Sequence, residues 1–220
     1  MSGFKTELHC HTIESSICGK VEAKEVVKAY IEAGYSTLVI TDHYGERHIG
    51  RHGEVDEVEH FLQGYRAAKQ AAGGKINIIL GMEISLAQHS FNDYLIYGDV
   101  EAALSAHPDL YQFDLPEFCD FAHKNNLVVY QAHPFRNKIT VVDPAPLDGI
   151  EVFNSHPRHD SRNNIASDWA AHFKKRAIAG SDAHQMPDIA RSGIIAETEI
   201  TNEKELLSVL KKEAYSLILL

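Results

Sequence analysis

The sequence predicts an α/β fold, either a parallel barrel or an open parallel sheet, and two observations favour the barrel. Short apolar runs that resemble strands alternate with amphipathic helical patterns along the chain, which is typical of parallel sheets with crossover helices. Potential metal ligands follow several of these runs, and ligands on many strand ends converge best at the mouth of a barrel. We therefore expect a single α/β barrel domain over residues 1–220.

The first part of the chain places each predicted strand before or after a helical pattern. Residues 4–8 form the first strand, and residues 22–33 carry apolar side chains at helical spacing that stops at Gly34. Residues 36–40 are apolar and partly β-branched, as buried strands are. A second helix runs from about residue 55 to residue 72 and precedes a strand at residues 76–80.

The rest of the chain continues this alternation. Residues 115–124 form a helix with Pro116 in its first turn, where the missing N–H costs little. Two further helices are predicted, at residues 163–174 and 203–212. The remaining predicted strands are residues 94–97, 127–131, 149–153, 177–179, 194–196 and 216–219.

Composition excludes several classes of protein. A formal net charge of −10 argues against a general nucleic-acid-binding surface, because that affinity comes from Lys and Arg, although a metal cluster can still attract a phosphorylated substrate. Cys10, Cys18 and Cys119 fit neither a disulfide framework nor a four-thiolate zinc site. The N-terminal residues lack the apolar core of a signal peptide, and no apolar run is long enough to span a bilayer, so we expect a cytoplasmic protein without membrane contact. The oligomeric state cannot be predicted from the sequence.

Five groups of potential metal ligands stand close to the predicted strand ends. Imidazole and carboxylate together favour zinc, manganese or iron over magnesium or calcium alone. The number of these ligand groups predicts a multinuclear metal site. The groups are His9-Cys10-His11, Asp42-His43, Glu83, His133 and Asp182-Ala183-His184.

Spacing suggests roles for the first two groups. His9 and His11 lie two apart, so on a strand they share a face and can bind one ion; the alternative is a surface or hydrogen-bonded pair. Asp42 and His43 are neighbours and point to opposite faces, so we expect one to bind metal and the other to support it, and we include Asp42 among the catalytic candidates. A structural Asp that caps the following turn is the alternative.

Glu83 lies between apolar neighbours, where an unpaired carboxylate would be costly, and we expect it to bridge two ions rather than to be solvated. His133 is a candidate ligand or a hydrogen-bonded histidine in a turn. Arg136 offers a planar fork suited to phosphate, with a surface ion pair as the alternative. Asp182 and His184 repeat the two-apart geometry, unless Asp182 only stabilises a turn.

Taken in order, these motifs resemble the PHP family, named for polymerase and histidinol phosphatase domains. The resemblance extends from near residue 5 to about residue 190. It implies a distorted barrel of seven strands and helices, with two or three divalent ions, zinc, manganese or iron, at its mouth. It also implies one set of ligand residues for each ion. The first set is His9, His11, Glu83 and Asp182, the second is Glu83 and His133, and the third is His43 with His184.

At two positions the sequence differs from the family pattern. Where the family often has a His or Asp for the third ion, this chain offers Glu14 or Cys18. Where the family often has a His for the second ion, it offers Asp93. His48 and His52, and also His156 and His159, lie close enough to the expected mouth to contact substrate, with solvated loops as the alternative.

Two hypotheses on function follow. The first is a metal-dependent phosphoesterase, a PHP-type phosphatase or phosphodiesterase, that hydrolyses a small phosphorylated molecule with a metal-activated water. No long nucleic acid is expected as a partner, because the chain has no second domain to grip a polymer. The alternative is a metal-binding regulatory or structural module without turnover.

Overall fold

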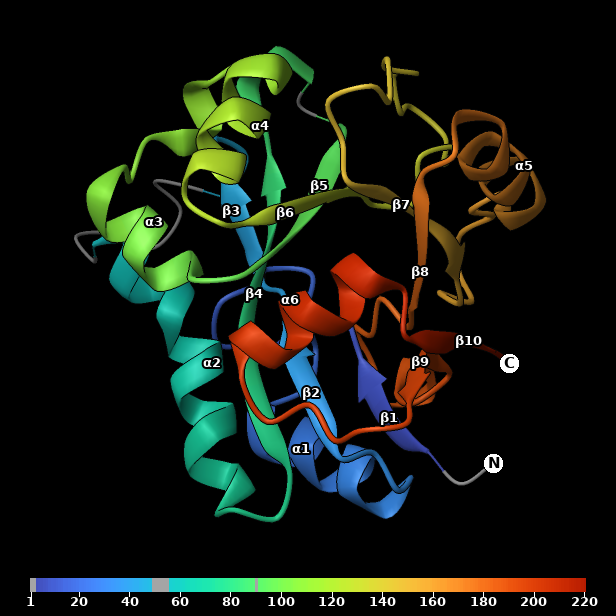
Figure 1. The fold of residues 1–220 in the computed structure, drawn as a ribbon. Coiled ribbons are helices and arrows are strands. Elements are labelled where there is room, and N and C mark those ends of the chain that lie inside the picture. The colour runs from blue at the N-terminus through green and yellow to red at the C-terminus, as the bar shows by residue number, and fades with distance from the viewer. Residues whose placement is uncertain (1–2, 49–55, 90) are drawn as a thin grey trace.

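A computed structural model of the protein describes residues 3–48, 56–89 and 91–220 (Figure 1). His52 and residue 55, the expected start of the second helix, lie outside the described residues. Helices surround a single strongly curved sheet. Its strands are β1 (Phe4–Glu7), β2 (Thr37–Ile40), β3 (His43–Gly45), β4 (Asn77–Ser85), β5 (Asp93–Tyr97), β6 (Val128–Gln131), β7 (Gly149–Asn154), β8 (Arg176–Gly180), β9 (Ser192–Ala196) and β10 (Tyr215–Leu219).

The sheet forms the predicted distorted α/β barrel, nearly closed. Its strands follow the order β10-β9-β1-β2-β4-β5-β6-β7-β8, with β3 paired to β4 beside this path. The edge strands meet where the Tyr215 hydroxyl on β10 donates to the Ala177 carbonyl on β8 at 2.9 Å. Cys10, after β1, pairs with Ala183, after β8, which brings the first and last motifs together. The path has nine strands where the resemblance implied seven.

The sheet is mixed, whereas the alternation of strands and helices predicts parallel strands. Strand β5 is antiparallel to both of its neighbours, β4 and β6, and β9 is antiparallel to β1 and β10. The link from the end of β4 at Ser85 to the start of β5 at Asp93 is short and includes the 3₁₀ turn Ala87–His89, whereas a parallel pair needs a longer crossover. Because β5 is reversed, its first residue, Asp93, lies at the mouth, where the other strands present their last residues.

The predicted helices are present; two have the predicted bounds, and the ends of the other three differ by one or two residues. They are α1 (Ala23–Glu32), α2 (Glu57–Ala72), α4 (Leu115–Lys124), α5 (Asn163–Phe173) and α6 (Glu203–Lys212). Asp56 caps the start of helix α2, because its side chain accepts from the amides of Val58 and Glu59. The sequence reading missed strand β3, helix α3 (Val100–Ala106) and two further 3₁₀ turns, Leu110–Gln112 and Met186–Asp188.

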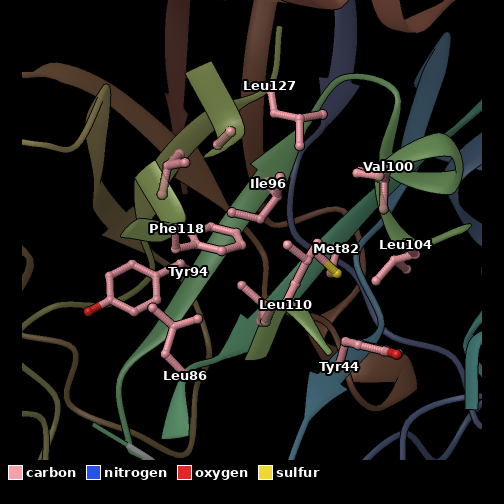
Figure 2. Packing of buried hydrophobic residues seen from close by; sticks show 14 of the residues in the cluster. Tyr44, Met82, Leu86, Tyr94, Ile96, Val100, Leu104, Leu110, Phe118 and Leu127 are labelled. Carbon is pink, nitrogen blue, oxygen red and sulfur yellow. The ribbon is translucent and has the colours of Figure 1, made fainter. Parts of the chain in front are cut away.

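Side chains along β4 and β5 alternate between an outer apolar face, which helices cover, and the barrel interior. Met82 and Ile96 point outward and pack with Phe118 of α4 and Leu104 of α3 (Figure 2). The alternate residues, such as Glu83 on β4 and its partner Leu95 on β5, point inward, so the face opposite Met82 carries Glu83 to the mouth. Leu206 and Leu210 of α6 pack against the apolar interior residues and close the other end of the barrel.

Candidate metal centre

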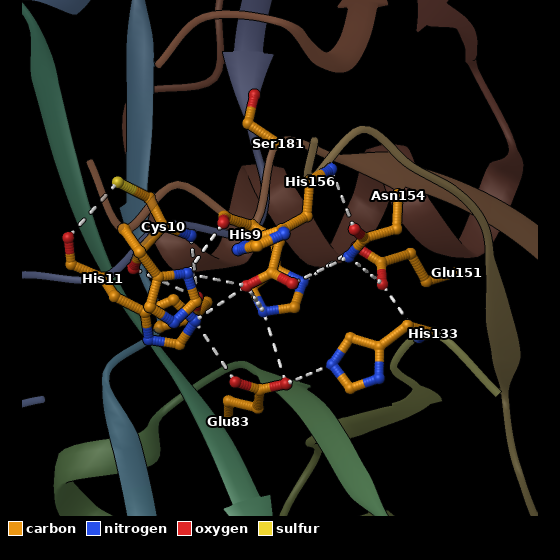
Figure 3. Close-up of polar contacts among 12 residues, drawn as sticks. His9, Cys10, His11, Glu83, His133, Glu151, Asn154, His156 and Ser181 are labelled. Atoms are coloured by element: carbon orange, nitrogen blue, oxygen red, sulfur yellow. Dashed lines mark hydrogen bonds and ion pairs between the residues drawn. The ribbon is translucent and has the colours of Figure 1, made fainter. Parts of the chain in front are cut away.

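Glu83 lies in the middle of the ligand cluster, surrounded by four imidazoles. Figure 3 shows those of His9, His11 and His133 around it. Its Oε1 lies 3.3 Å from Nε2 of His9 and 3.1 Å from Nε2 of His133. Its Oε2 lies 3.2 Å from Nε2 of His11 and 3.1 Å from Nδ1 of His43. Strand β4 extends through Ser85, so Glu83 lies within a paired strand and not beyond its end. A carboxylate with two imidazoles at each oxygen is suited to sharing between two ions.

Asp182 is the second carboxylate of the cluster. Its Oδ1 lies 3.4 Å from Nε2 of His9, 3.3 Å from Nε2 of His11 and 3.3 Å from Nδ1 of His184. The chain turns sharply here, because Asp182 has a φ of 51° in the left-handed region. The preceding Gly180 allows β8 to approach β1 closely, since a Cβ there would lie 2.4 Å from the Cβ of His9.

The side chains of the cluster fit divalent cations. Among the described residues, four buried ligand atoms make no hydrogen bond: Nε2 of His9, Nε2 of His11, Nδ1 of His43 and Oε2 of Glu83. Leaving such atoms unsatisfied in a dry interior is costly, and coordination to a cation would offset that cost. Three groups of ligand atoms lie close enough to hold the ions of the centre: His9, His11 and Glu83; His9, His133 and Asp182; and Glu83, Asp93 and His133.

Glu151, which the sequence reading did not identify, orients His9. Its Oε1 lies 2.8 Å from Nδ1 of His9, and its Oε2 accepts from the amide of His133 at 2.9 Å. The ionised carboxylate can only accept, so Nδ1 of His9 carries a proton, and Nε2, which faces Glu83 and Asp182, would present its lone pair to a bound ion. The available signal was a carboxylate in the apolar run 149–153, where a buried charge needs a partner.

Asp42 supports the cluster from behind. Its oxygens accept from the amide and hydroxyl of Thr12, both at 2.7 Å, and from the hydroxyl of Ser16 at 2.6 Å. Ser16 Oγ in turn accepts from the amide of His43 at 3.0 Å and lies 3.4 Å from Nδ1 of His11. Of the neighbouring pair, His43 therefore faces Glu83, whereas Asp42 acts on the cluster through Ser16.

Asp93 joins the cluster from the start of β5. Its Oδ1 accepts from the Ser85 hydroxyl and from Nη2 of Arg47, both at 2.6 Å. Burial raises the pKa of the Asp93 carboxyl, as does repulsion from Glu83, while His133 and Arg47 oppose the shift. Arg47 thus stabilises a carboxylate where the family pattern often has an imidazole.

Arg136 is committed to Asp182. Its Nη2 donates to Oδ2 of Asp182 at 2.6 Å and to Oδ1 of Asn154 at 2.7 Å, and its Nε donates to Ser161 at 3.2 Å. The side chain retains 15 % exposure. The structure therefore places the expected phosphate ligand beside the cluster, where its charge balances Asp182.

Opposite charges shape the protonation of the cluster. Burial alone would lower the pKa of His11, but the carboxylates of Asp182 and Glu83, 3.3 and 3.2 Å from its Nε2, raise it to about 9. Burial would raise the pKa of Glu83, but the imidazoles of His9 and His43 hold it well below its usual range. Protons on imidazoles therefore balance the carboxylates here, and binding of divalent ions would release those protons.

The rim residues come from loops. His156 lies with Asp182 and His184 in a group that could hold an ion, and burial lowers the pKa of His156 to about 4. His159 stacks on His156 with ring centroids 4.7 Å apart, and His48 stacks on His43 at 4.4 Å. Arg158 pairs with Asp188, whose Oδ2 also accepts from the amides of His184 and Gln185. The loops thus bring His48, His156, His159 and Arg158 to the mouth.

Comparison with known proteins agrees with this geometry. The sequence pattern of the PHP domain family matches residues 7–216. Residues of this chain are 31% identical over 101 positions to the PolC-type DNA polymerase III of Streptococcus pneumoniae serotype 4, and 30% identical to that of Streptococcus sanguinis. These matches cover 46% of this chain but only 6% of either polymerase.

Three solved structures share the fold. PsfC from Pseudomonas syringae has a TM-score of 0.75 at 15% identity, covering all of this chain and 93% of PsfC. A two-domain protein from Bacteroides vulgatus, described as containing a predicted PHP-like metal-dependent phosphoesterase, has a TM-score of 0.72 at 17% identity, covering 99% of this chain and 65% of that one. The lesion-specific endonuclease PfuEndoQ from Pyrococcus furiosus has a TM-score of 0.66 at 12% identity, covering 98% of this chain and 58% of that one.

Among the described residues, no helix is both long and apolar enough to cross a membrane.

Proposed function

Because the chain belongs to the PHP domain family, we propose that it is a metal-dependent phosphoesterase acting on a small phosphorylated molecule. The observation that carries this proposal is the set of four buried ligand atoms without hydrogen bonds around Glu83 and Asp182. Bound divalent ions at such a site polarise phosphoryl oxygens and lower the pKa of a water molecule.

The chain's own residues would orient the histidine ligands and set the charge at the mouth. Glu151 holds His9 in one tautomer, and Ser16 does the same for His11. Arg136, with Asp182 already bound, has its exposed edge available to a phosphate oxygen at the mouth. Neutral His156 and His184, whose pKa values burial lowers to about 4, leave the rim without added positive charge, so attraction of phosphate would depend on the ions and Arg136.

A small substrate is favoured by charge. A net charge of −10 opposes a long phosphate backbone, which proteins bind mainly through Lys and Arg. A phosphodiester in DNA is the second candidate, because the sequence resembles part of a DNA polymerase and the fold resembles that of a lesion-specific endonuclease.

A substrate screen tests the proposal. Purified protein with manganese or zinc would be assayed against a panel of phosphate monoesters, phosphodiesters and end-labelled single-stranded DNA. We expect metal-stimulated release of phosphate from at least one monoester, and no such release by a His9→Ala/His11→Ala double variant. Cleavage of DNA alone would favour the second candidate, and no activity above the double variant would contradict both.

A further inference from the structure

The loop at residues 12–20 brings a thiol to the outer edge of the metal centre. One ligand atom each of Cys18, His11, His43 and His184 lies within 4.8 Å of the others, so a single ion could contact them all. The other two cysteines, Cys10 and Cys119, are buried in apolar clusters. Cys18 is therefore the cysteine that the structure places among imidazoles.

The loop holds Cys18 closely against the rest of the site. Gly19 donates its amide to the carbonyl of Ser16 at 2.9 Å, and Lys20 donates to the carbonyl of His184 at 2.8 Å. A Cβ on Gly19 would lie 2.4 Å from the Thr12 carbonyl oxygen, so a larger residue would force the loop outward. These contacts fix the thiol beside the turn that carries His184.

Two imidazoles of this group carry buried nitrogens that make no hydrogen bond to a described residue and lie 3.2 and 3.1 Å from Oε2 of Glu83. His11 is 1 % exposed, and its Nε2 makes no hydrogen bond among the described residues. Nδ1 of His43 is likewise buried without a hydrogen bond in this part of the structure. An ion at this position would satisfy nitrogen atoms that the protein leaves unpaired.

Glu14, the other residue that could complete this site from the loop, has a different role. Its two carboxylate oxygens accept from the amide of Ala23 at 2.9 and 3.1 Å, at the start of helix α1. A carboxylate in that place satisfies an orphan amide and complements the helix dipole. The structure thus separates the two candidates, with Glu14 on the helix and Cys18 at the centre.

We propose that Cys18, with His43 and His184, holds a third metal ion through its sulfur, and that this outer site prefers zinc to manganese. Thiolate is a soft ligand that selects zinc, whereas carboxylate and water suit manganese. The two ions around Glu83 would have only imidazole and carboxylate ligands, so the outer ion would differ from them in metal preference. This inference rests on the metal centre proposed above and does not depend on the substrate.

Cobalt substitution tests the sulfur ligand directly. A thiolate bound to Co²⁺ gives an intense near-ultraviolet charge-transfer band, which imidazole and carboxylate ligands do not give. We expect this band in the cobalt-loaded protein. In Cys18→Ser the band should be lost, and the cobalt content should fall by about one ion per chain. Cys119→Ala and Glu14→Gln serve as matched controls and should retain both the band and the full cobalt content.

A second variant covers the case in which Cys18→Ser does not fold. Cys18→Asp supplies an anionic oxygen, so we expect near-normal cobalt content without the charge-transfer band. When loaded with zinc and dialysed against excess manganese, the unsubstituted protein should retain about one zinc ion per chain more than Cys18→Asp does.

The outcomes separate this inference from the proposed function. Cobalt bound in full without a charge-transfer band, or a band that survives in Cys18→Asp, would overturn the role of Cys18 while leaving the Glu83 centre intact. Failure of the unsubstituted protein to bind any cobalt would overturn both.

Discussion

The inner and outer parts of the metal centre are held in different ways. The inner residues, such as His9 and Glu83, are fixed by the sheet, Glu83 within the paired strand β4 and His9 by the carboxylate of Glu151. The outer residues, such as Cys18 and His156, lie on loops and are fixed by a few backbone contacts or by neighbouring side chains. From this difference we expect the inner residues to determine whether the ions around Glu83 bind, and the outer residues to adjust which further ion and which substrate bind.

The largest expected effect comes from Glu83 in the inner part. Glu83→Gln removes a negative charge that faces four imidazoles, so neighbouring ions would repel each other with less compensation. His133→Ala removes one ligand from one ion. We therefore expect Glu83→Gln to lose about one ion more per chain than His133→Ala, measured by elemental mass spectrometry. Equal metal retention in the two variants, with the fold intact by circular dichroism, would contradict a bridging role.

Glu151 should have an intermediate effect, because it contacts the ligand and not the ion. Glu151→Gln removes the charge that fixes the tautomer of His9, and we expect metal affinity to fall about 10- to 100-fold. Competition with a metal chelator would measure this affinity. Glu117→Gln, on the exposed start of α4, is the matched control and should leave it unchanged. An affinity unchanged in Glu151→Gln would show that the inner part does not depend on this support.

The smallest effect is expected at the outer rim. Arg158 is 39 % exposed and donates to both carboxylate oxygens of Asp188, which in turn accepts from the amides of the turn at His184. Arg158→Gln should therefore lower kcat/KM by about fivefold or less on the best substrate, with metal content unchanged. Arg66→Gln, in an exposed pair on α2, controls for loss of surface charge. A fall of two orders of magnitude would mean that the rim takes part in catalysis as directly as the inner part.

Sequence reasoning worked best for the inner part. His9, His11, Glu83, His133 and Asp182 were predicted to lie together, and they do, because each stands on or beside a strand whose position the sheet fixes. His184, predicted with them, lies beside Asp182 on the outer side. The reversed direction of β5 was not predicted, although Asp93 before that strand was named as a candidate.

The supporting residues could not be predicted in the same way. Glu151 contacts His9 across 142 positions of sequence, and the link from Asp42 to His43 passes through Ser16 in a loop. Such contacts depend on how loops and strands meet in space, which neither motif spacing nor periodicity specifies. Cys18 and Glu14 remained equal candidates for the same reason, until the structure placed Glu14 at the start of α1.

The number of metal ions bound per chain tests the central claim most directly. Native mass spectrometry of the purified protein, after loading with zinc or manganese and removal of excess ions, would give this number. A multinuclear centre organised by Glu83 predicts two or more ions on each chain. One ion or none would contradict it and favour a metal-binding module without turnover.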